Sequence, residues 1–190
     1  MTLWVEILFA VLGAAIGSFL NVLIHRLPEE QSIVFPASRC PRCGRAIRFY
    51  DNIPVLSYIL LRGRCRDCGE KIALRYPLVE AITAAFSLLL FWKYGVTFQW
   101  LFSFAFVCAL IVITFIDLDH QIIPDVISLP GIPIFFLAAV FVMKLRFLDA
   151  FLGFLIGGGV LYGIAFDYKL LPKSEGMAGG HFQRGTAKAF

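Results

Sequence analysis

The sequence predicts an all-α polytopic membrane protein with about five transmembrane helices and one cysteine-bearing loop. The first observation is composition: 59% of the 190 residues are hydrophobic and 16% are charged, whereas soluble domains carry about 25% charged residues. The second is that the apolar residues gather in runs long enough to cross a bilayer. The third is that a basic stretch with two C-x-x-C pairs separates the first two runs.

Five apolar runs are predicted to cross the bilayer as helices, because one crossing needs about 20 apolar residues. The first run has no basic stretch before it and exceeds the apolar core of a cleavable signal peptide, so we expect it to be a span. The second run is short, and its helix is expected to extend at its start. The fourth is loosened by Pro130 and Pro133. In chain order the predicted spans are residues 2–24, 78–92, 100–116, 126–143 and 148–166.

The charge pattern predicts which segments face the cytoplasm. Residues 25–77 hold ten Lys or Arg and five Asp or Glu, a net charge of +5, and the other 137 residues sum to −1. Basic loops stay in the cytoplasm, which places the N-terminus outside. The predicted organisation is a first transmembrane helix in 1–24, a cytoplasmic loop in 25–77, helices two to five in 78–166 with an acidic loop at 117–125, and a cytoplasmic tail in 167–190.

Small residues predict where the helices touch. Gly13 and Gly17 lie four apart on the first span, and glycines recur more densely from Gly153 to Gly163. In lipid, small residues at this spacing let two helix backbones approach closely. A phosphate-binding glycine loop is the weaker interpretation, because no strand precedes the glycines.

The four cysteines of the loop predict a metal site. They form two C-x-x-C pairs, each followed by a glycine that suits a tight turn. Four thiolates fit a tetrahedral Zn²⁺ ion and leave no open position for a substrate, so this zinc-ribbon-like loop is predicted to be structural. Two disulfides are the alternative, which a reducing cytoplasm disfavours. The predicted ligands are Cys40, Cys43, Cys65 and Cys68, and the arginines expected to favour their thiolate forms are Arg39, Arg42, Arg64 and Arg66.

Three carboxylates and a histidine crowd the end of the third span, between Ile116 and Asp125. Ionisable groups at membrane depth are costly and suggest a function. Asp117 is nearest to the apolar run, and partial burial would suit it to acid–base chemistry. A solvated turn that ends the helix explains these residues equally well. Aspartyl proteolysis needs two carboxylates that share a site, and the second would more naturally come from another span.

Several motifs together resemble the type IV prepilin peptidases. They extend over about residues 17–180 and are specific in combination. The matching stretches are GSFLNVLIHRLP at 17–28, the two C-x-x-C pairs with NIPVLSY at 52–58 between them, RYPLVE at 75–80, and D-x-D-H-x-x-x-P-D at 117–125.

This resemblance implies a multi-pass aspartyl protease of the bacterial inner membrane, of the GxGD type. Its partners would be type IV prepilins and pseudopilins, whose basic leaders members cut after a glycine, and the lipid bilayer. Many members also N-methylate the new terminus with S-adenosylmethionine. By this similarity Asp117 is the first catalytic aspartate and the zinc-bearing loop is the domain associated with methylation. No nucleic acid is expected, because the loop's arginines flank a membrane whose anionic lipids they would contact.

The sequence departs from the family at its second aspartate. The family places that residue at the end of a G-x-G-D motif, whereas this chain reads GMAGGH at 176–181. Ala178 replaces the first glycine and His181 replaces the aspartate. A histidine cannot reproduce two carboxylates that share a proton. We expect a reading frame lost near Ala178 or a truncated gene, which the coding DNA would decide.

Two other interpretations stay open. An inactive remnant, or a zinc-bearing binding module, would hold prepilin without cutting it, and His181 favours this. An unrelated zinc-bearing membrane scaffold or transporter is disfavoured, because no pair of broken helices marks a substrate site. The sequence leaves open whether Asp119 or Asp125 replaces the missing acid.

Overall fold

The computed structural model describes residues 3–35, 38–40 and 42–157. Within these residues the fold is helical, with no strand and only two isolated β-bridges in the cysteine loop. The elements are α1 (Leu3–Arg26), the short 3-10 helix η1 (Phe49–Asn52), α2 (Leu56–Leu60), α3 (Arg75–Tyr94), α4 (Phe98–His120) and α5 (Asp125–Phe141). A further short apolar helix covers Phe147–Gly157. The predicted all-α class is therefore confirmed.

The chain divides into two compact units, Met1–Lys144 and Leu145–Phe190. The first holds the cysteine loop and helices α1 to α5. The second is described only as far as residue 157, through the helix Phe147–Gly157.

Three helices, α1, α3 and α4, are long and apolar enough to cross a membrane. Helix α3 begins at Arg75, before the first apolar residue of its run, as expected for this short span. Helices α5 and Phe147–Gly157 are apolar but shorter. The predicted fifth span, 148–166, extends beyond the described residues, so a total of about five spans stays a prediction.

The acidic segment 117–125 begins within a helix rather than a loop. Helix α4 continues through both of its aspartates to His120. It ends where Gln121 takes the left-handed conformation (φ 53°) and its N–H donates to the carbonyl of Asp117, a common way to end a helix. Asp125 lies in the first turn of α5. The α4 aspartates therefore point in directions fixed by helix geometry.

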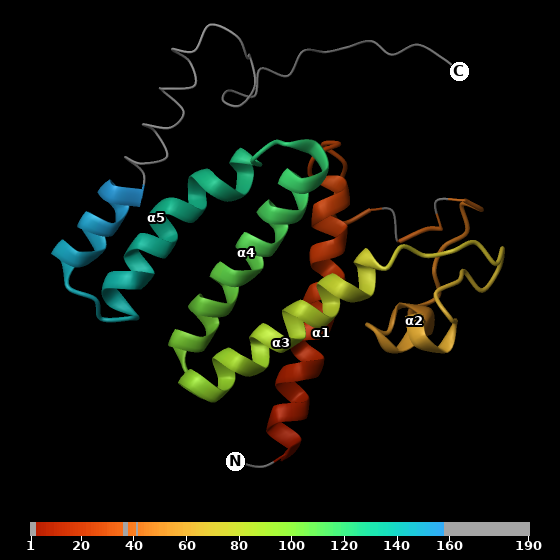
Figure 1. Cartoon of the computed structure of the whole chain (residues 1–190), viewed down its shortest axis with the longest axis horizontal. Helices are drawn as coiled ribbons and strands as arrows, with labels where there is room; N and C mark the ends of the chain where they lie inside the picture. The colour runs from red at the N-terminus through yellow and green to blue at the C-terminus, as the bar shows by residue number, and fades with distance from the viewer. Residues whose placement is uncertain (1–2, 36–37, 41, 158–190) are drawn as a thin grey trace, which may run out of the picture. The chain divides into compact units, whose positions relative to one another are not determined.

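Helices α1 and α3 cross at close range (Figure 1). A Cβ built on Gly13 would lie 2.6 Å from the Cβ of Ser87, and one built on Gly17 would lie 2.7 Å from the Cα of Glu80. Both distances are far below van der Waals contact, so only glycine fits at either position. The predicted role of this glycine pair in helix packing is confirmed.

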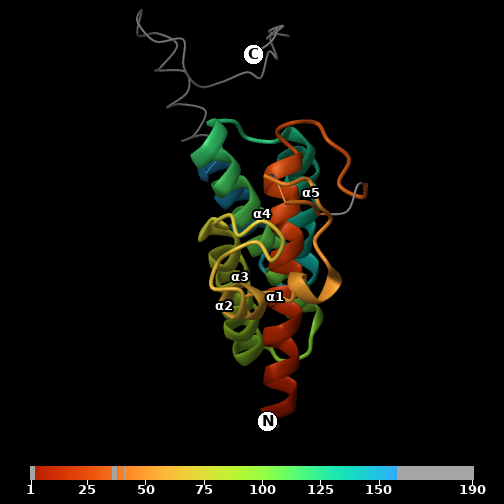
Figure 2. The same ribbon diagram turned by 90° about the vertical axis from the view of Figure 1, so that its right-hand side faces the viewer.

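Two apolar clusters fill the space between α1, α3 and α4, and Figure 2 shows α1 and α4 running alongside one another. In one cluster the ring of Phe9 stacks on Phe91 at 4.3 Å and meets Trp100 edge-on at 4.7 Å. Cys108 is half-buried and packs against both clusters, as a small apolar residue would. The other cluster consists of Leu20, Ile24, Val79, Ile111, Val112 and Ile116.

Buried polar groups in these helices are satisfied within the protein. The hydroxyl of Thr83 donates to the Val79 carbonyl at 2.7 Å, and that of Ser87 donates to the Phe9 carbonyl at 2.8 Å. The indole N–H of Trp100 donates to the Ser87 carbonyl at 3.1 Å. No buried side-chain N or O in the described part of the chain lacks a partner, as a hydrocarbon environment requires.

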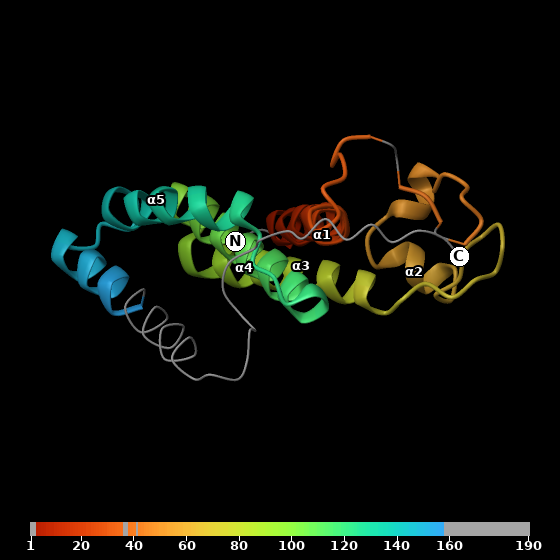
Figure 3. The same ribbon diagram turned by 90° about the horizontal axis from the view of Figure 1, so that it is seen from above.

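The outward faces of the helices are apolar. On α1, Trp4 is 79% exposed and Leu8 62% exposed, and α5 shows the same for Val126 and Leu129. Exposed apolar residues on this scale indicate a surface that faces lipid. Figure 3 shows the cysteine loop and α2 to one side of α1 and α3.

Replacing Gly17 by valine is predicted to destabilise the protein, because the new side chain would collide with the backbone of Glu80. Overpacking costs about 1–3 kcal/mol, and for a chain of this length we therefore expect the melting temperature in detergent to fall by about 2–12 °C. Ala15→Val is the matched control, since Ala15 is exposed on the same helix. An equal loss in both variants would contradict the contact and point to the valine itself.

Candidate functional site

The cysteine loop brings its four predicted ligands together. The sulfurs of Cys40, Cys43, Cys65 and Cys68 all lie within 4.8 Å of one another, and all four are free thiols. The Sγ atoms of Cys40 and Cys68 are 3.8 Å apart. Four sulfurs at ~2.3 Å from one tetrahedral Zn²⁺ ion would be about 3.8 Å apart. These side chains therefore fit a single tetrahedral metal ion, and we call the group the cysteine clip.

The two halves of the clip repeat one another at an offset of 25 residues, from Cys40 to Cys65. In each half the amide of the first cysteine donates to the backbone carbonyl five residues further on. Cys40 donates to Arg45 at 2.9 Å, and Cys65 donates to Glu70 at 2.8 Å. The glycine after each second cysteine has positive φ, 67° at Gly44 and 71° at Gly69, a conformation that favours glycine. The sequence analysis missed this repeat, although SRCPRCGRAI and GRCRDCGEKI align without a gap.

Opposite charges join the two halves. Arg42 Nε lies 3.9 Å from Glu70 Oε2, and Arg45 Nη1 lies 3.2 Å from Asp67 Oδ1. Arg42 is equivalent to Asp67 in the repeat, and Arg45 to Glu70, so one half supplies both cations and the other both anions. Each exposed pair contributes roughly 0–1 kcal/mol. These ion pairs hold the first half of the clip, which carries the cations, against the second half, which carries the anions.

One thiol of the clip is poised to ionise. The amides of Cys43 and Arg42 lower the pKa of Cys40 to about 7. The amide of Glu70 lowers the pKa of Cys68, but burial and the neighbouring sulfurs outweigh it and raise that pKa to about 12. A bound cation would favour loss of the remaining protons, because metal ligation requires thiolates.

Two of the arginines expected to assist the thiolates bond carboxylates instead. Arg42 pairs with Glu70, as described above. Arg66 donates twice to Asp51 Oδ1, at 2.6 and 3.0 Å, and once to Oδ2 at 2.9 Å. The Arg66 guanidinium holds the pKa of Asp51 below its usual value. These arginines therefore hold the loop together rather than serve the sulfurs alone.

One hydrogen bond attaches the cysteine loop to α3, and a second joins α1 to the first turn of α3. The amide of Val55 donates to the Glu80 carboxylate in α3 at 2.7 Å, and the Asn21 side chain in α1 donates to the Tyr76 carbonyl at 3.1 Å. Glu80 and Asn21 are both buried. The sequence analysis missed the role of Glu80, although an acid inside an apolar run is a recognisable signal.

Arg75 connects the end of the cysteine loop to the end of α4. It forms an ion pair with Asp119 and donates to the Phe115 carbonyl at 3.2 Å. Its guanidinium also lies 5.2 Å from the centre of the Phe115 ring. Asp119 is thereby held against α3, and Arg75 is a second residue whose role the sequence analysis missed.

Asp117 points to a different side of α4 from Asp119. At about 100° per residue, it aligns with Gln99 and Phe106, which contact Val142 and Phe135 on the side of α5. Asp117 is exposed, contrary to the partial burial considered above, and forms no ion pair within the described residues. Asp125 is also exposed, whereas His181 lies outside the described residues.

Removing one sulfur of the clip is predicted to abolish tight metal binding. Cys43→Ser should lower bound zinc from about one ion per chain to well below that, because a tetrahedral structural site needs all four ligands. Cys108→Ser is the control and should leave zinc unchanged, since Cys108 packs inside the helices. Zinc is measured by mass spectrometry of the purified protein. Equal zinc in the two variants would contradict the assignment of the clip.

Comparison with known proteins gives the same family from two parts of the chain. Family models match the bacterial peptidase A24 N-terminal domain over residues 11–94 and the type IV leader peptidase family over residues 104–183. The first match covers most of α1, the cysteine clip and α3, and the second covers Asp117. No solved structure matches the chain.

Relatives named prepilin leader peptidase/N-methyltransferase occur in several bacteria. That of Pseudomonas putida is 35% identical, over 96% of this chain and 74% of its own length. That of Myxococcus xanthus is 45% identical, over 79% of this chain and 44% of its own length. That of Neisseria gonorrhoeae is 37% identical, over 93% of this chain and 70% of its own length. This chain, a membrane protein with a clip that fits a metal ion, therefore belongs to the type IV leader peptidase family of proteases, whose relatives also carry the N-methyltransferase name.

Proposed function

We propose that this chain is a membrane aspartic endopeptidase that cleaves the leader peptides of type IV prepilins and pseudopilins. Family membership supports the reaction class and the substrate. The observation that supports a working site in this chain is the state of Asp117, which lies exposed in the last turn of α4. Its neighbour Asp119 is already paired with Arg75. Asp117 is the first catalytic aspartate in this proposal.

Asp119 is a poor candidate for the second acid. Two residues along a helix turn the side chain by about 200°, so Asp117 and Asp119 point to opposite sides of α4. Carboxylates that share one proton must lie together. Asp125 belongs to a different helix, is exposed and has no ion pair in the described part of the chain. It is the candidate that remains, since His181 cannot supply a carboxylate.

The cleavage site lies at the cytoplasmic face of the bacterial inner membrane in this proposal. The net charge of +5 on residues 25–77 supports a cytoplasmic cysteine loop. Arg75 joins the end of that loop to the turn of α4 that carries Asp117. This contact supports a topology in which the loop and Asp117 face the cytoplasm, where the prepilin leader would be cut, and the N-terminus lies outside.

The clip holds a structural Zn²⁺ ion in this proposal, because four sulfur ligands leave no position for a substrate. The name of the relatives supports a second activity, methylation of the new N-terminus with S-adenosylmethionine as the methyl donor. No residue of this chain is assigned to it.

The second candidate is a binding module that retains prepilin without cutting it. His181 supports it, because the resemblance places the second aspartate there. Both candidates keep the cysteine clip and the membrane helices, and only a cleavage experiment separates them.

Replacing Asp117 by asparagine is predicted to lower leader cleavage at least about 1000-fold, because an amide cannot act as base or acid. Asp119→Asn is the matched control and should keep cleavage within about tenfold, since its amide oxygen still accepts from Arg75. The full chain is co-expressed with a prepilin, and leader removal is read by mass. Comparable loss in both variants would contradict the assignment of Asp117.

Replacing Asp125 by asparagine tests the second acid. If Asp125 shares the proton, Asp125→Asn should lose cleavage as completely as Asp117→Asn. Full cleavage by Asp125→Asn would exclude it from the reaction. No cleavage by the unmodified chain, once it is shown to insert and to hold zinc, would support an inactive remnant or a binding module instead.

A further inference from the structure

The cations of the cysteine loop differ in whether a carboxylate neutralises them. Four arginines each form an ion pair with a carboxylate: Arg42, Arg45, Arg66 and Arg75. Among the remaining cations, three that lie close together in the sequence form no ion pair with any described residue: Arg62, Arg64 and Lys71. Unpaired cations that gather in one place attract an anion from outside the chain.

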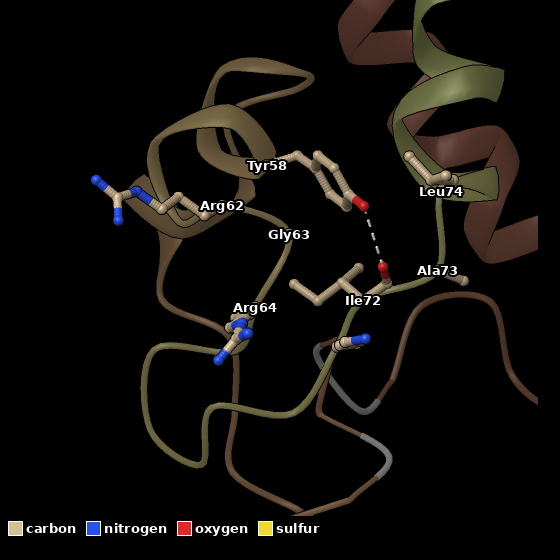
Figure 4. A pocket seen from close by; sticks show the side chains of 8 residues that line it. Tyr58, Arg62, Gly63, Arg64, Ile72, Ala73 and Leu74 are labelled. Atoms are coloured by element: carbon tan, nitrogen blue, oxygen red, sulfur yellow. Dashed lines mark hydrogen bonds between the residues drawn. The ribbon is translucent and has the colours of Figure 1, made fainter.

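The three unpaired cations line one open pocket of about 500 Å³. The remaining lining residues include no acid: Tyr58, Gly63, Ile72, Ala73 and Leu74. Figure 4 shows the Tyr58 hydroxyl donating to the Ile72 carbonyl, a contact of 3.3 Å, with Arg62 and Leu74 on opposite sides of the pocket. The pocket lining therefore combines three cations with apolar side chains and no acid.

The backbone forces two of these cations together. Arg64 and Lys71 are partners in an antiparallel bridge, and the amide of Ile72 donates to the Gly63 carbonyl beside it at 2.7 Å. Like charges directly opposite one another are destabilising. In the other half of the clip the equivalent bridge pairs Arg39 with Ala46, which carries no charge. A bound anion would remove the repulsion that only the second half contains.

The pocket lies beside exposed apolar side chains at the start of a candidate span. Leu74, 73% exposed, immediately precedes α3. Helix α2 exposes three more aliphatic side chains outside the spans: Leu56 at 50%, Ile59 at 63% and Leu60 at 73%. Cations next to aliphatic side chains are typical of the layer between lipid head groups and acyl chains. A soluble anion or an acidic peptide would make no use of this apolar surface.

We propose that the pocket formed by Arg62, Arg64 and Lys71 binds the phosphate group of an anionic phospholipid in the leaflet that α3 enters. The acyl chains of that lipid lie along Leu74 and α2. Binding fixes the cysteine loop against the membrane surface. The site is separate from Asp117 and does not depend on leader cleavage.

The test uses the full chain in a neutral detergent, with phosphatidylglycerol or phosphatidylcholine added and bound lipid counted by native mass spectrometry. Each cation near an anionic lipid contributes about 1 kcal/mol. Arg64→Gln should therefore weaken phosphatidylglycerol binding about fivefold, and the triple variant Arg62→Gln/Arg64→Gln/Lys71→Gln about 100-fold. Arg39→Gln removes the same charge at the equivalent position of the repeat and should change binding less than about twofold.

Three outcomes would overturn the proposal. One is equal phosphatidylglycerol binding by Arg39→Gln and Arg64→Gln, and another is equal binding of the two lipids by the unmodified chain. The third is displacement of phosphatidylglycerol by glycerol phosphate or a polyglutamate peptide at the same concentration, which would assign the pocket to a soluble anion or an acidic protein. Zinc content is measured in every variant, so that a misfolded loop is distinguished from lost binding. The two single variants decide the matter even if the triple variant misfolds.

Discussion

The contact between α1 and α3 at Gly13 and Gly17 is the constraint on which the rest of the described structure depends. In lipid two helices gain little from apolar contact alone, so close backbone approach and satisfied polar groups must hold them together. Here the glycines remove the steric barrier, and Thr83 and Ser87 direct their hydroxyls to backbone carbonyls. Trp100 then bonds the Ser87 carbonyl and brings α4 into the same packing.

The same contact places the cysteine loop. Glu80 lies against Gly17 and accepts from the amide of Val55, so a buried carboxylate of the membrane helices holds the middle of the loop. Arg75, where the loop ends, reaches α4 and engages Asp119. The cysteine clip and the acidic end of α4 are thereby parts of one connected arrangement. Because Asp119 is used for this connection, Asp117 is left exposed on the other side of the helix.

The cations of the loop have three distinct roles, which the net charge of the loop does not reveal. Arg42 and Arg45 match the two unlike halves of the clip, and Arg66 fixes Asp51. Arg62, Arg64 and Lys71 remain without carboxylates among the described residues and line one pocket. Arg64 and Lys71 are bridge partners in the second half of the repeat, whereas the equivalent bridge in the first half pairs Arg39 with the uncharged Ala46. The cations behind the net charge of +5 therefore pair the two halves of the clip, fix Asp51 and leave one pocket open to anions.

The sequence by itself determined the all-α class, the positions of α1, α3 and α4, the small-residue contact at Gly13 and Gly17, and which four cysteines gather in the clip. These features depend on local composition and spacing, because hydrocarbon length selects apolar helices and tetrahedral coordination selects four sulfurs. Only the tertiary structure decided that Asp119 pairs with Arg75 and that the Glu80 carboxylate accepts from the Val55 amide. Those assignments depend on which side of each helix faces a neighbour, and residues 25 to 44 apart in the chain meet only after the helices have packed.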